Sequence, residues 1–439
     1  MRAVPSDHVV PPPFAEFSRT AAKIGLVSFG GPAGQIALMH REMVDERGWV
    51  DEEQFLQALN LCNLLPGPEA QQLATWIGWK LHGWKGGLVA GGLFVLPGAL
   101  VMLALSILYG FATGMEWFQA IFLGIKAAVL AIVAQALIRI ASRALHTPFQ
   151  IALAIAAFLA LFLFAAPFPV VVLAALAIGA AAGARRPGWL AFKPTDQATP
   201  SGNRPWRATL VALVAWSAIW AAPLVTIRLA LGPDHVLWQI GVFFSKLAVV
   251  TFGGAYAVLA YMAQEAVSGY GWLGAGEMAD GLGLAETTPG PLILVTQFVG
   301  YMGAFRAPDP FSPVVAGVLG AVLTTWVTFA PCFMWIFALA PWMMRLQRAP
   351  AMKGALAGVT ACVVGVIANL ALWFALHVLF GRFRLADYGP VHLQVPDWAS
   401  FDLAAGLIAV AAFTMIFVLK RGILFTLAVA AALGLVAGL

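Results

Sequence analysis

Charged side chains are scarce in this sequence: they make up 10% of 439 residues, whereas 61% of the residues are hydrophobic. Soluble proteins carry about 25% charged residues, so this chain has too few charges to cover the surface of a soluble globule. The composition therefore excludes soluble protein classes and favours an integral membrane protein. The formal net charge of +5 comes from basic residues clustered between apolar segments, which marks them as topology signals and argues against a nucleic-acid-binding patch.

Residue clusters with catalytic or metal-binding character are also missing. The three cysteines, Cys62, Cys332 and Cys362, lie far apart in apolar stretches and have no metal-ligand spacing. The histidines form no cluster, and no Walker motif, nucleotide-binding loop or catalytic triad is present. We therefore expect no metal, no cofactor and no enzymatic activity, and an ATP-driven pump would need a separate motor subunit.

The apolar segments predict the fold class. Residues 1–13 lack the apolar core of a cleavable signal peptide and are predicted to form a cytoplasmic tail. A spanning helix needs about 20 mostly apolar residues, and thirteen segments are candidates. These segments are 14–40, 54–79, 86–112, 117–143, 149–166, 168–185, 207–230, 238–262, 277–302, 312–341, 354–379, 400–419 and 421–439. The sequence thus predicts an all-α integral membrane protein.

The loops that carry Lys and Arg set the predicted orientation. Cytoplasmic loops of membrane proteins are enriched in these residues, so the most basic loop, between Arg185 and Arg207, is assigned to the cytoplasm. With thirteen helices, this choice places the N-terminus in the cytoplasm and the C-terminus in the periplasm of a bacterial inner membrane. Arg382 and Arg384 then fall outside, so the rule is followed imperfectly.

The two halves of the chain match each other at an offset of 223 residues. The pairs are Lys23 with Lys246, Phe29-Gly30-Gly31 with Phe252-Gly253-Gly254, Glu42 with Glu265, Gly48-Trp49 with Gly271-Trp272, and Pro66-Gly67-Pro68 with Pro289-Gly290-Pro291. Such varied motifs in one register indicate an internal duplication. We assign residues 14–186 to the first repeat, 187–236 to a basic cytoplasmic loop and linker helix, and 237–439 to the second repeat.

Helix parity predicts how the two repeats are related. Seven predicted helices separate their starting points, and an odd number reverses the orientation of the second copy. Inverted repeats are common in secondary transporters, which bind substrate near the bilayer midplane where the copies meet. If one short segment is re-entrant, the parity changes and the repeats are parallel.

Each copy carries a Pro-Gly-Pro sequence inside an apolar segment, at residues 66–68 and 289–291. Proline breaks a helix, and a break at membrane depth is tolerated only where it is buried in protein or lines a cavity. The helix that follows each break presents unbonded amide groups and the positive end of its dipole, which suits an anion. A packing kink without a ligand is the alternative interpretation.

Polar residues near the two breaks are the candidate ligands of such an anion. Lys23 and Lys246 would supply positive charge, unless they only extend to the membrane interface. Glu286 and Glu69 are candidates for proton coupling, although Glu69 also suits the first turn of a helix and Glu286 could neutralise a lysine. The predicted substrate-binding residues are Lys23, Ser28, Gly30, Gly31, Asn63, Gly67, Gln71, Lys246, Thr251, Gly253, Gly254, Tyr256, Thr287, Thr288 and Gly290.

These motifs resemble the chromate ion transporter family in its long form with two homologous domains. The resemblance rests on Ser28-Phe29-Gly30-Gly31-Pro32, Leu65-Pro66-Gly67-Pro68, Phe94-Val95-Leu96-Pro97-Gly98, the string from Thr251 to Leu259, and the string from Glu286 to Ile293. It runs from about Phe14 to the C-terminus and is weakest in 144–237 and after 380. Asn63 departs from the glutamine of many members, which puts only fine selectivity in doubt.

The resemblance implies export of chromate from the bacterial cytoplasm, and with it chromate resistance. The expected partners are chromate, sulfate as a related or competing ligand, the lipid bilayer and, for a homodimer, a second copy of the chain; no nucleic acid is expected. A sulfate-type oxyanion importer or exchanger is the first alternative. The others are a membrane scaffold and a membrane enzyme that acts on a lipid or reduces chromate. Reduction would need a flavin, haem or metal site, for which the sequence has no motif.

Overall fold

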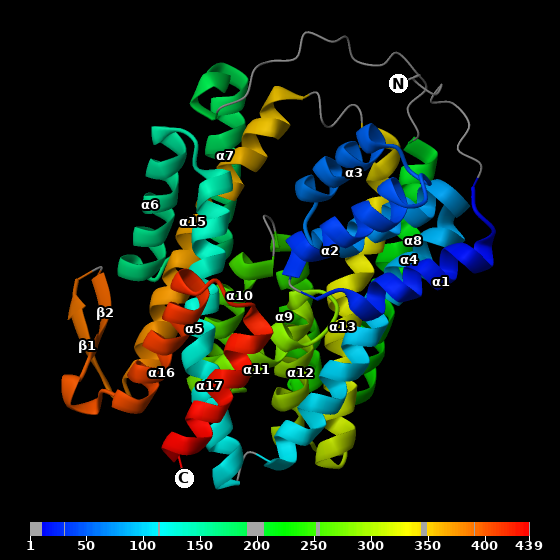
Figure 1. Ribbon diagram of the computed structural model, residues 1–439. Coiled ribbons are helices and arrows are strands. Elements are labelled where there is room, and N and C mark those ends of the chain that lie inside the picture. The colour runs from blue at the N-terminus through cyan, green and yellow to red at the C-terminus, as the bar shows by residue number, and fades with distance from the viewer. Residues whose placement is uncertain are drawn as a thin grey trace. The chain divides into compact units, whose positions relative to one another are not determined.

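The computed structural model describes residues 11–29, 31–112, 115–190, 206–251, 255–343, 349–389 and 391–438. The described chain is predominantly helical and contains one two-stranded hairpin (Figure 1). Among the described helices, six are long and apolar enough to cross a membrane, and five shorter apolar helices accompany them. The predicted class, an all-α integral membrane protein, is confirmed, whereas the number of thirteen spans stays a prediction.

The chain forms two compact units, and each unit draws on both halves of the sequence. The first unit comprises Met1–Ala104, Gln197–Ala255 and Thr288–Arg348. Its helices are α1 (Phe14–Val27), α2 (Gly31–His40), η1 (Arg41–Asp45), α3 (Glu52–Leu64), most of α4 (Glu69–Ala112), α8 (Trp206–Leu231), α9 (Val236–Val250), η4 (Leu292–Leu294), α12 (Val295–Arg306), α13 (Pro313–Leu339) and η5 (Ala340–Trp342).

The second unit comprises Leu105–Asp196, Tyr256–Thr287 and Ala349–Leu439. Its helices are α5 (Glu116–Ala144), α6 (Pro148–Phe164), α7 (Phe168–Arg185), η2 (Pro187–Leu190), α10 (Ala255–Gln264), η3 (Glu265–Gly269), α11 (Ala275–Thr287), α15 (Pro350–Leu379), η6 (Trp398–Ser400), α16 (Leu403–Phe413), η7 (Thr414–Val418) and α17 (Ile423–Gly438). The strands β1 (Phe383–Tyr388) and β2 (Val391–Pro396) pair antiparallel.

Several predicted spans are divided in the structure. The predicted helix 14–40 is interrupted after Val27, and α1 and α2 share its length. The predicted helix 54–79 is interrupted at Pro66-Gly67-Pro68, and 277–302 at Pro289-Gly290-Pro291. The range of α4 also contains a sharp turn at His82 and Gly83, whose backbone angles are non-helical, so residues 69–81 and 84–112 form two helices. This turn lies between the predicted spans 54–79 and 86–112. These interruptions are short because proline and glycine end a helix within a residue or two.

Local structure repeats at the same offset as the sequence. Helices α3 (Glu52–Leu64) and α11 (Ala275–Thr287) begin and end at equivalent positions, as do the ends of α1 at Val27 and α9 at Val250. The residues that follow, Ser28 and Thr251, have almost the same backbone angles, with φ −78° and ψ 78° or 81°. The duplication therefore extends from the residue pattern to the conformation of the backbone.

Close helix packing in the second unit depends on glycine. A Cβ atom added at Gly183 of α7 would lie 2.6 Å from the Cα atom of Gly354 in α15, and one at Gly179 would lie 2.9 Å from the Cα atom of Gly358. Small residues allow two backbones to approach in this way, and such packing is common between membrane helices. These glycines explain why the short helix α7 is firmly placed against α15.

Candidate functional site

The two Pro-Gly-Pro breaks are buried and lie in the same compact unit. Gly67 has a φ of 122° and Gly290 a φ of 86°, and such positive angles favour glycine because it has no Cβ atom. Pro68 precedes the first residue of α4, and Pro291 precedes η4, which continues into α12. Each break therefore delivers a new helix start into the interior of the unit.

A reciprocal pair of backbone hydrogen bonds connects the breaks to the opposite repeat. The amide of Gly67 donates to the carbonyl oxygen of Thr251 at 2.8 Å, and the amide of Gly290 donates to that of Ser28 at 2.9 Å. Since 28 and 251, and 67 and 290, are equivalent positions, the two bonds are the same bond made twice. The glycine amides are thus already bonded, and the amides open to an anion are those of the helix turns that follow.

The hydroxyl groups of Ser28 and Thr251 bond to their own helices. Ser28 Oγ donates to the carbonyl oxygen of Ile24 at 2.5 Å, and Thr251 Oγ1 donates to that of Leu247 at 2.6 Å. These bonds satisfy carbonyl groups in the last turns of α1 and α9, where the helix has no further amide groups to bond them. Both hydroxyls are buried, so they shape the backbone that accepts the glycine amides.

Three buried glutamines surround the breaks. Gln35 Nε2 donates to the carbonyl oxygen of Gly290 at 2.7 Å, Gln72 Nε2 to that of Pro66 at 2.8 Å, and Gln71 Nε2 to Thr75 Oγ1 at 3.1 Å. The amide oxygen of each glutamine has no hydrogen-bond partner among the described residues. The sequence candidates included Gln71 but not Gln35 or Gln72, which have no counterpart at the equivalent position of the second repeat.

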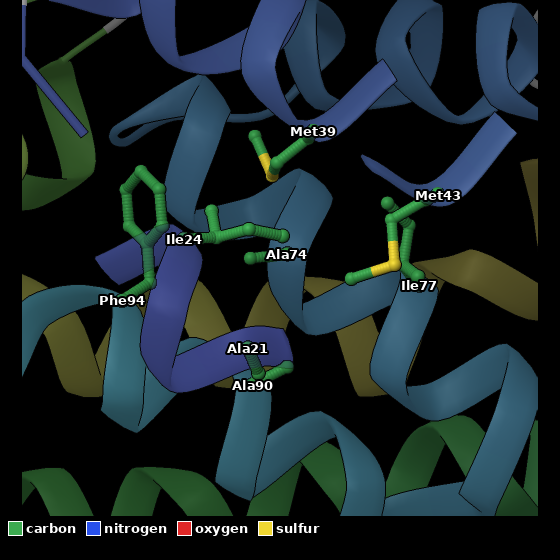
Figure 2. Close-up of a pocket in the computed structure, with 8 residues that line it drawn as sticks. All are labelled: Ala21, Ile24, Met39, Met43, Ala74, Ile77, Ala90 and Phe94. Atoms are coloured by element: carbon green, nitrogen blue, oxygen red, sulfur yellow. The ribbon is translucent and has the colours of Figure 1, made fainter. Parts of the chain in front are cut away.

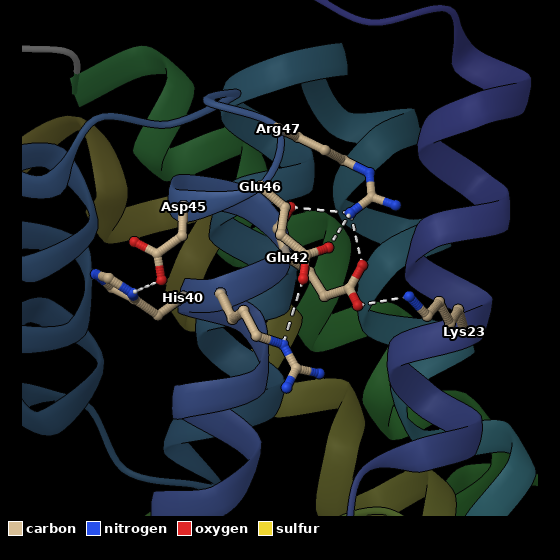
Figure 3. Close-up of polar contacts among 7 residues, drawn as sticks. Lys23, His40, Glu42, Asp45, Glu46 and Arg47 are labelled. Carbon is tan, nitrogen blue, oxygen red and sulfur yellow. Dashed lines mark hydrogen bonds and ion pairs between the residues drawn. The ribbon is translucent and has the colours of Figure 1, made fainter.

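Lys23 is paired with a buried carboxylate, as Figure 3 shows. Its Nζ atom donates to Glu42 Oε1 at 2.6 Å, and Arg47 Nη1 donates to Glu42 Oε2 at 2.6 Å. The Glu42 side chain is 1% exposed, whereas that of Lys23 is 54% exposed. Two cations therefore share this buried carboxylate, and Arg47 also lies 3.6 Å from Glu46 Oε2. Lys23 and Glu42 both belong to the repeated motifs, but the sequence does not indicate that they pair.

A pocket beside this network is apolar. Figure 2 shows its lining residues, which are Ala21, Ile24, Met39, Met43, Ala74, Ile77, Ala90 and Phe94. None of these side chains carries a hydrogen-bond donor suited to an oxyanion. An anion site in this unit would therefore lie at the helix starts and not in this pocket.

The other sequence candidates are placed as follows. Gly30, Gly253, Gly254 and the side chain of Tyr256 lie outside the described residues. Asn63 and Lys246 are exposed, Glu69 is partly buried as the first residue of α4, and Thr288 is buried beside the second break. Gly31 begins α2 with a φ of 72°. Glu286 and Thr287 end α11 and belong to the second compact unit, where Thr287 Oγ1 donates to the carbonyl oxygen of Leu284 at 2.8 Å.

His40 gives a testable pH dependence near the site. Its Nε2 atom lies 2.5 Å from Glu52 Oε2, and Nδ1 lies 3.2 Å from Asp45 Oδ2. The hydrogen bond with Glu52 raises the pKa of His40 above its ordinary value of 6.5, while burial opposes this shift. Because the pKa is raised in the folded state, the stabilisation is complete below the ordinary pKa and is lost as the pH rises through the folded-state pKa.

We therefore expect the unfolding temperature of the purified protein in detergent to fall as the pH rises above 6.5 and through the higher, folded-state pKa of His40. His40→Gln should remove this component of the fall, because its side chain does not titrate. The double substitution Asp45→Asn with Glu52→Gln should remove it as well. A fall that persists unchanged in both variants would assign the pH dependence to another group.

Comparison with known proteins identifies the family. A family model described as Chromate transporter matches residues 15–180 and 238–435, one segment in each half of the chain. The chain belongs to the chromate transporter family. Proteins of this family are transport proteins, so the chain is a multi-pass membrane transporter and not an enzyme.

Named relatives match this chromate transporter over most of its length. It is 34% identical to the "Chromate transport protein" of Pseudomonas aeruginosa over 83% of this chain and 81% of that protein. It is 28% identical to the "Chromate transport protein" of Cupriavidus metallidurans over 80% of each chain. An "Uncharacterized transporter" of Methanocaldococcus jannaschii is 27% identical over 81% of this chain. No solved structure matches the transporter.

Proposed function

We propose that this transporter exports chromate from the bacterial cytoplasm by alternating access, with the dianion bound at the helix starts that follow the two Pro-Gly-Pro breaks. The observation that supports this most is the reciprocal pair of bonds from Gly67 to Thr251 and from Gly290 to Ser28. These bonds hold both breaks in one compact unit, so two helix starts of related geometry can serve one ligand.

The chemistry of a helix start suits chromate. The first turns of α4 and η4 carry amide groups without acceptors in the same helix, and the helix dipole favours negative charge there. Thr288 adds a buried hydroxyl beside the second break. Gln71 and Gln72 are buried near the first break, and their Nε2 groups, which donate to Thr75 Oγ1 and to the carbonyl oxygen of Pro66, would turn to meet the anion. Because these groups carry no formal charge, they hold the dianion less tightly than cations would, which allows its release.

The membrane potential supports export as the direction. An inside-negative potential drives a dianion outward with about 2.3 kcal/mol per charge for each 100 mV. Export would therefore be favourable on this term without a coupling ion. The proposal places the transporter in the inner membrane with its N-terminus in the cytoplasm. It also keeps the repeats inverted, as helix parity predicts.

Flux in proteoliposomes tests the proposal. We expect the wild-type protein to carry labelled chromate down an imposed potential, in the direction that moves negative charge toward the positive side. Thr288→Val should lower this flux about tenfold, because a hydrogen bond to a charged group contributes about 1.5–3 kcal/mol. Lys246→Ala should lower it to a smaller extent, since Lys246 is exposed and its charge is screened.

Lys80→Ala provides the control, because Lys80 is also exposed but lies outside the repeat motifs. Its flux should equal that of the wild type. If the protein carries sulfate but no chromate, the alternative function, a sulfate-type oxyanion transporter, would be favoured. Equal chromate flux in the wild type and in Thr288→Val would remove the second break from the site.

A further inference from the structure

A buried carboxyl group in the second compact unit is not among the sequence candidates. Asp280, on α11, is 3% exposed. Its Oδ2 atom accepts a hydrogen bond from Tyr109 Oη at 2.6 Å, and Lys126 Nζ lies 3.4 Å from the same oxygen. The other oxygen, Oδ1, is buried without a hydrogen-bond partner among the described residues. Only one side of this carboxyl group is therefore satisfied.

The surrounding helices are shaped around this group. Gly276, Asp280 and Gly283 follow one another at helical spacing and form one face of α11 toward α5. A Cβ atom added at Gly276 would lie 3.1 Å from Lys126 Nζ, and one at Gly283 would lie against Ile125. The missing side chain at Gly276 leaves room for the lysine to reach Asp280, so the pair depends on this glycine face.

We propose that Asp280 is the residue that binds and releases the transported proton, with Lys126 as its switchable partner, so that chromate movement is linked to proton movement. This inference rests on the proposed transport function. An ionisable side chain inside a membrane protein is expensive to bury and is a functional candidate by default. A carboxylate with one oxygen lacking any donor is destabilised, and a proton bound at Oδ1 removes the negative charge.

The proton step involves no oxidation or reduction. In the charged state Asp280 is a carboxylate and holds the Lys126 ammonium. When Oδ1 takes a proton, Asp280 becomes a neutral acid, keeps the bond from Tyr109 and no longer neutralises Lys126. Lys126 is 26% exposed on its side chain, so its ammonium can turn to other surroundings. The two states differ in the charge that α5 and α11 carry together.

Other charged groups near Asp280 are few. On α11, Glu277 adds a like charge, and Glu286 lies near the end of the helix. On the end of α4 that faces α11, Tyr109 is the titratable side chain. On α5 the charged residues besides Lys126 are Glu116, Arg139 and Arg143 near the helix ends, and on α15 Lys353 and His377 lie near the ends while the titratable Cys362 is buried.

The site is specific to the second half of the chain. The equivalent of Asp280 in the first half is Gln57, whose amide does not titrate. The proposed proton site therefore belongs to one copy of the repeat and not to both. The asymmetry also explains why a search for residues shared by both copies passes over Asp280.

Proteoliposomes that contain a pH-sensitive dye test the proposal directly. Wild-type vesicles should show proton movement that accompanies labelled chromate flux. Asp280→Asn should lower the chromate-linked proton movement at least about tenfold, while chromate exchange at equal pH persists. Glu116→Gln, which changes an exposed carboxyl at the start of α5, should leave both signals at the wild-type level. Chromate-linked proton movement that is equal in Asp280→Asn and the wild type would overturn the proposal.

Infrared difference spectroscopy of the full-length protein in lipid gives a second readout that needs no transport. A protonated carboxyl band that titrates should be present in the wild type, absent in Asp280→Asn and shifted in Tyr109→Phe, which lacks the donor to Oδ2. Lys126→Gln should keep the band to higher pH, because the cation that favours the carboxylate is gone. The same titrating band in the wild type and in Asp280→Asn would exclude Asp280. If the wild type carries no chromate, the proposed transport function is wrong. The infrared spectrum would still show whether Asp280 binds a proton, so the two failures can be told apart.

Discussion

Replacing Gly98 with alanine should lower chromate transport about a hundredfold. Gly98, on α4, lies directly against the carbonyl oxygen of Pro289 in the second break, and an added Cβ atom would also lie 2.7 Å from Leu294 Cδ1. The main obstacle is backbone, which cannot move aside as a flexible side chain would. The break must shift, and the hydrogen bond from Gly290 to Ser28 is lost with it.

We expect this substitution to cost about 3 kcal/mol of stability and to lower chromate flux about a hundredfold. Gly92→Ala is the matched control, since it adds the same methyl group to the same helix at a position with no atom within 4 Å. Thermal unfolding in detergent and flux in proteoliposomes measure the two effects. Wild-type flux in Gly98→Ala would show that transport does not require α4 to hold the second break.

Removing both cations from Glu42 should have the second large effect. The double substitution Lys23→Met with Arg47→Met leaves a carboxylate that is 1% exposed without either ion-pair partner. Breaking a buried pair in this way costs about 3–5 kcal/mol, because the charge remains buried and uncompensated. Addition of Glu42→Gln should recover most of this loss, since a neutral amide is less costly to bury.

Arg41→Met is the control for this experiment. Arg41 pairs with Glu46 at 3.6 Å, and both side chains are at least half exposed, so its loss should change stability by about 0–1 kcal/mol. Unfolding temperatures of the variants in detergent provide the measurement. The triple variant combines Lys23→Met, Arg47→Met and Glu42→Gln. If it is as unstable as the double variant, the loss of stability comes from the missing lysine and arginine side chains and not from the unpaired carboxylate of Glu42.

The pH dependence of this network has a defined sign. Burial acts to raise the pKa of Glu42, but the hydrogen bonds from Lys23 and Arg47 outweigh it and hold the pKa below its ordinary value of 4.5. The network therefore stabilises the protein fully above that ordinary value and loses its effect as the pH falls through the lower, folded-state pKa. This dependence has the opposite sign to that of His40, so the two can be separated.

The sequence was sufficient for the features that depend on composition and on repetition. Low charge and long apolar segments predicted an all-α membrane protein, and matched Pro-Gly-Pro motifs predicted two helix breaks. The same reasoning joined residues 14–40 into one helix, because an interruption at Ser28 replaces few apolar residues and leaves the hydropathy high. The hairpin of β1 and β2 was not predicted either, although the sequence Gly389-Pro390 signals a turn between its strands, because the expected elements were based on long apolar segments alone.

Pairings across the chain could not be predicted from one sequence. Gln35 and Gly290 are separated by 255 positions, and Tyr109 and Asp280 by 171, so nothing local connects them. The repeat pointed to residues that occur twice, such as Lys23 and Lys246. It was uninformative about Asp280 and Lys126, which occur in one copy each. Their pairing is a property of the folded second unit.

The reciprocal bonds between the two halves also bear on how such a chain could have arisen. A protein made of the first half alone would present the Gly67 donor and the Ser28 acceptor with nothing to bond. Two copies of that half, related by a two-fold axis, would satisfy both groups at once, because each copy offers what the other lacks. Gene fusion then only needs to join two partners that already interlock, and afterwards each half supplies the donor of one bond and the acceptor of the other.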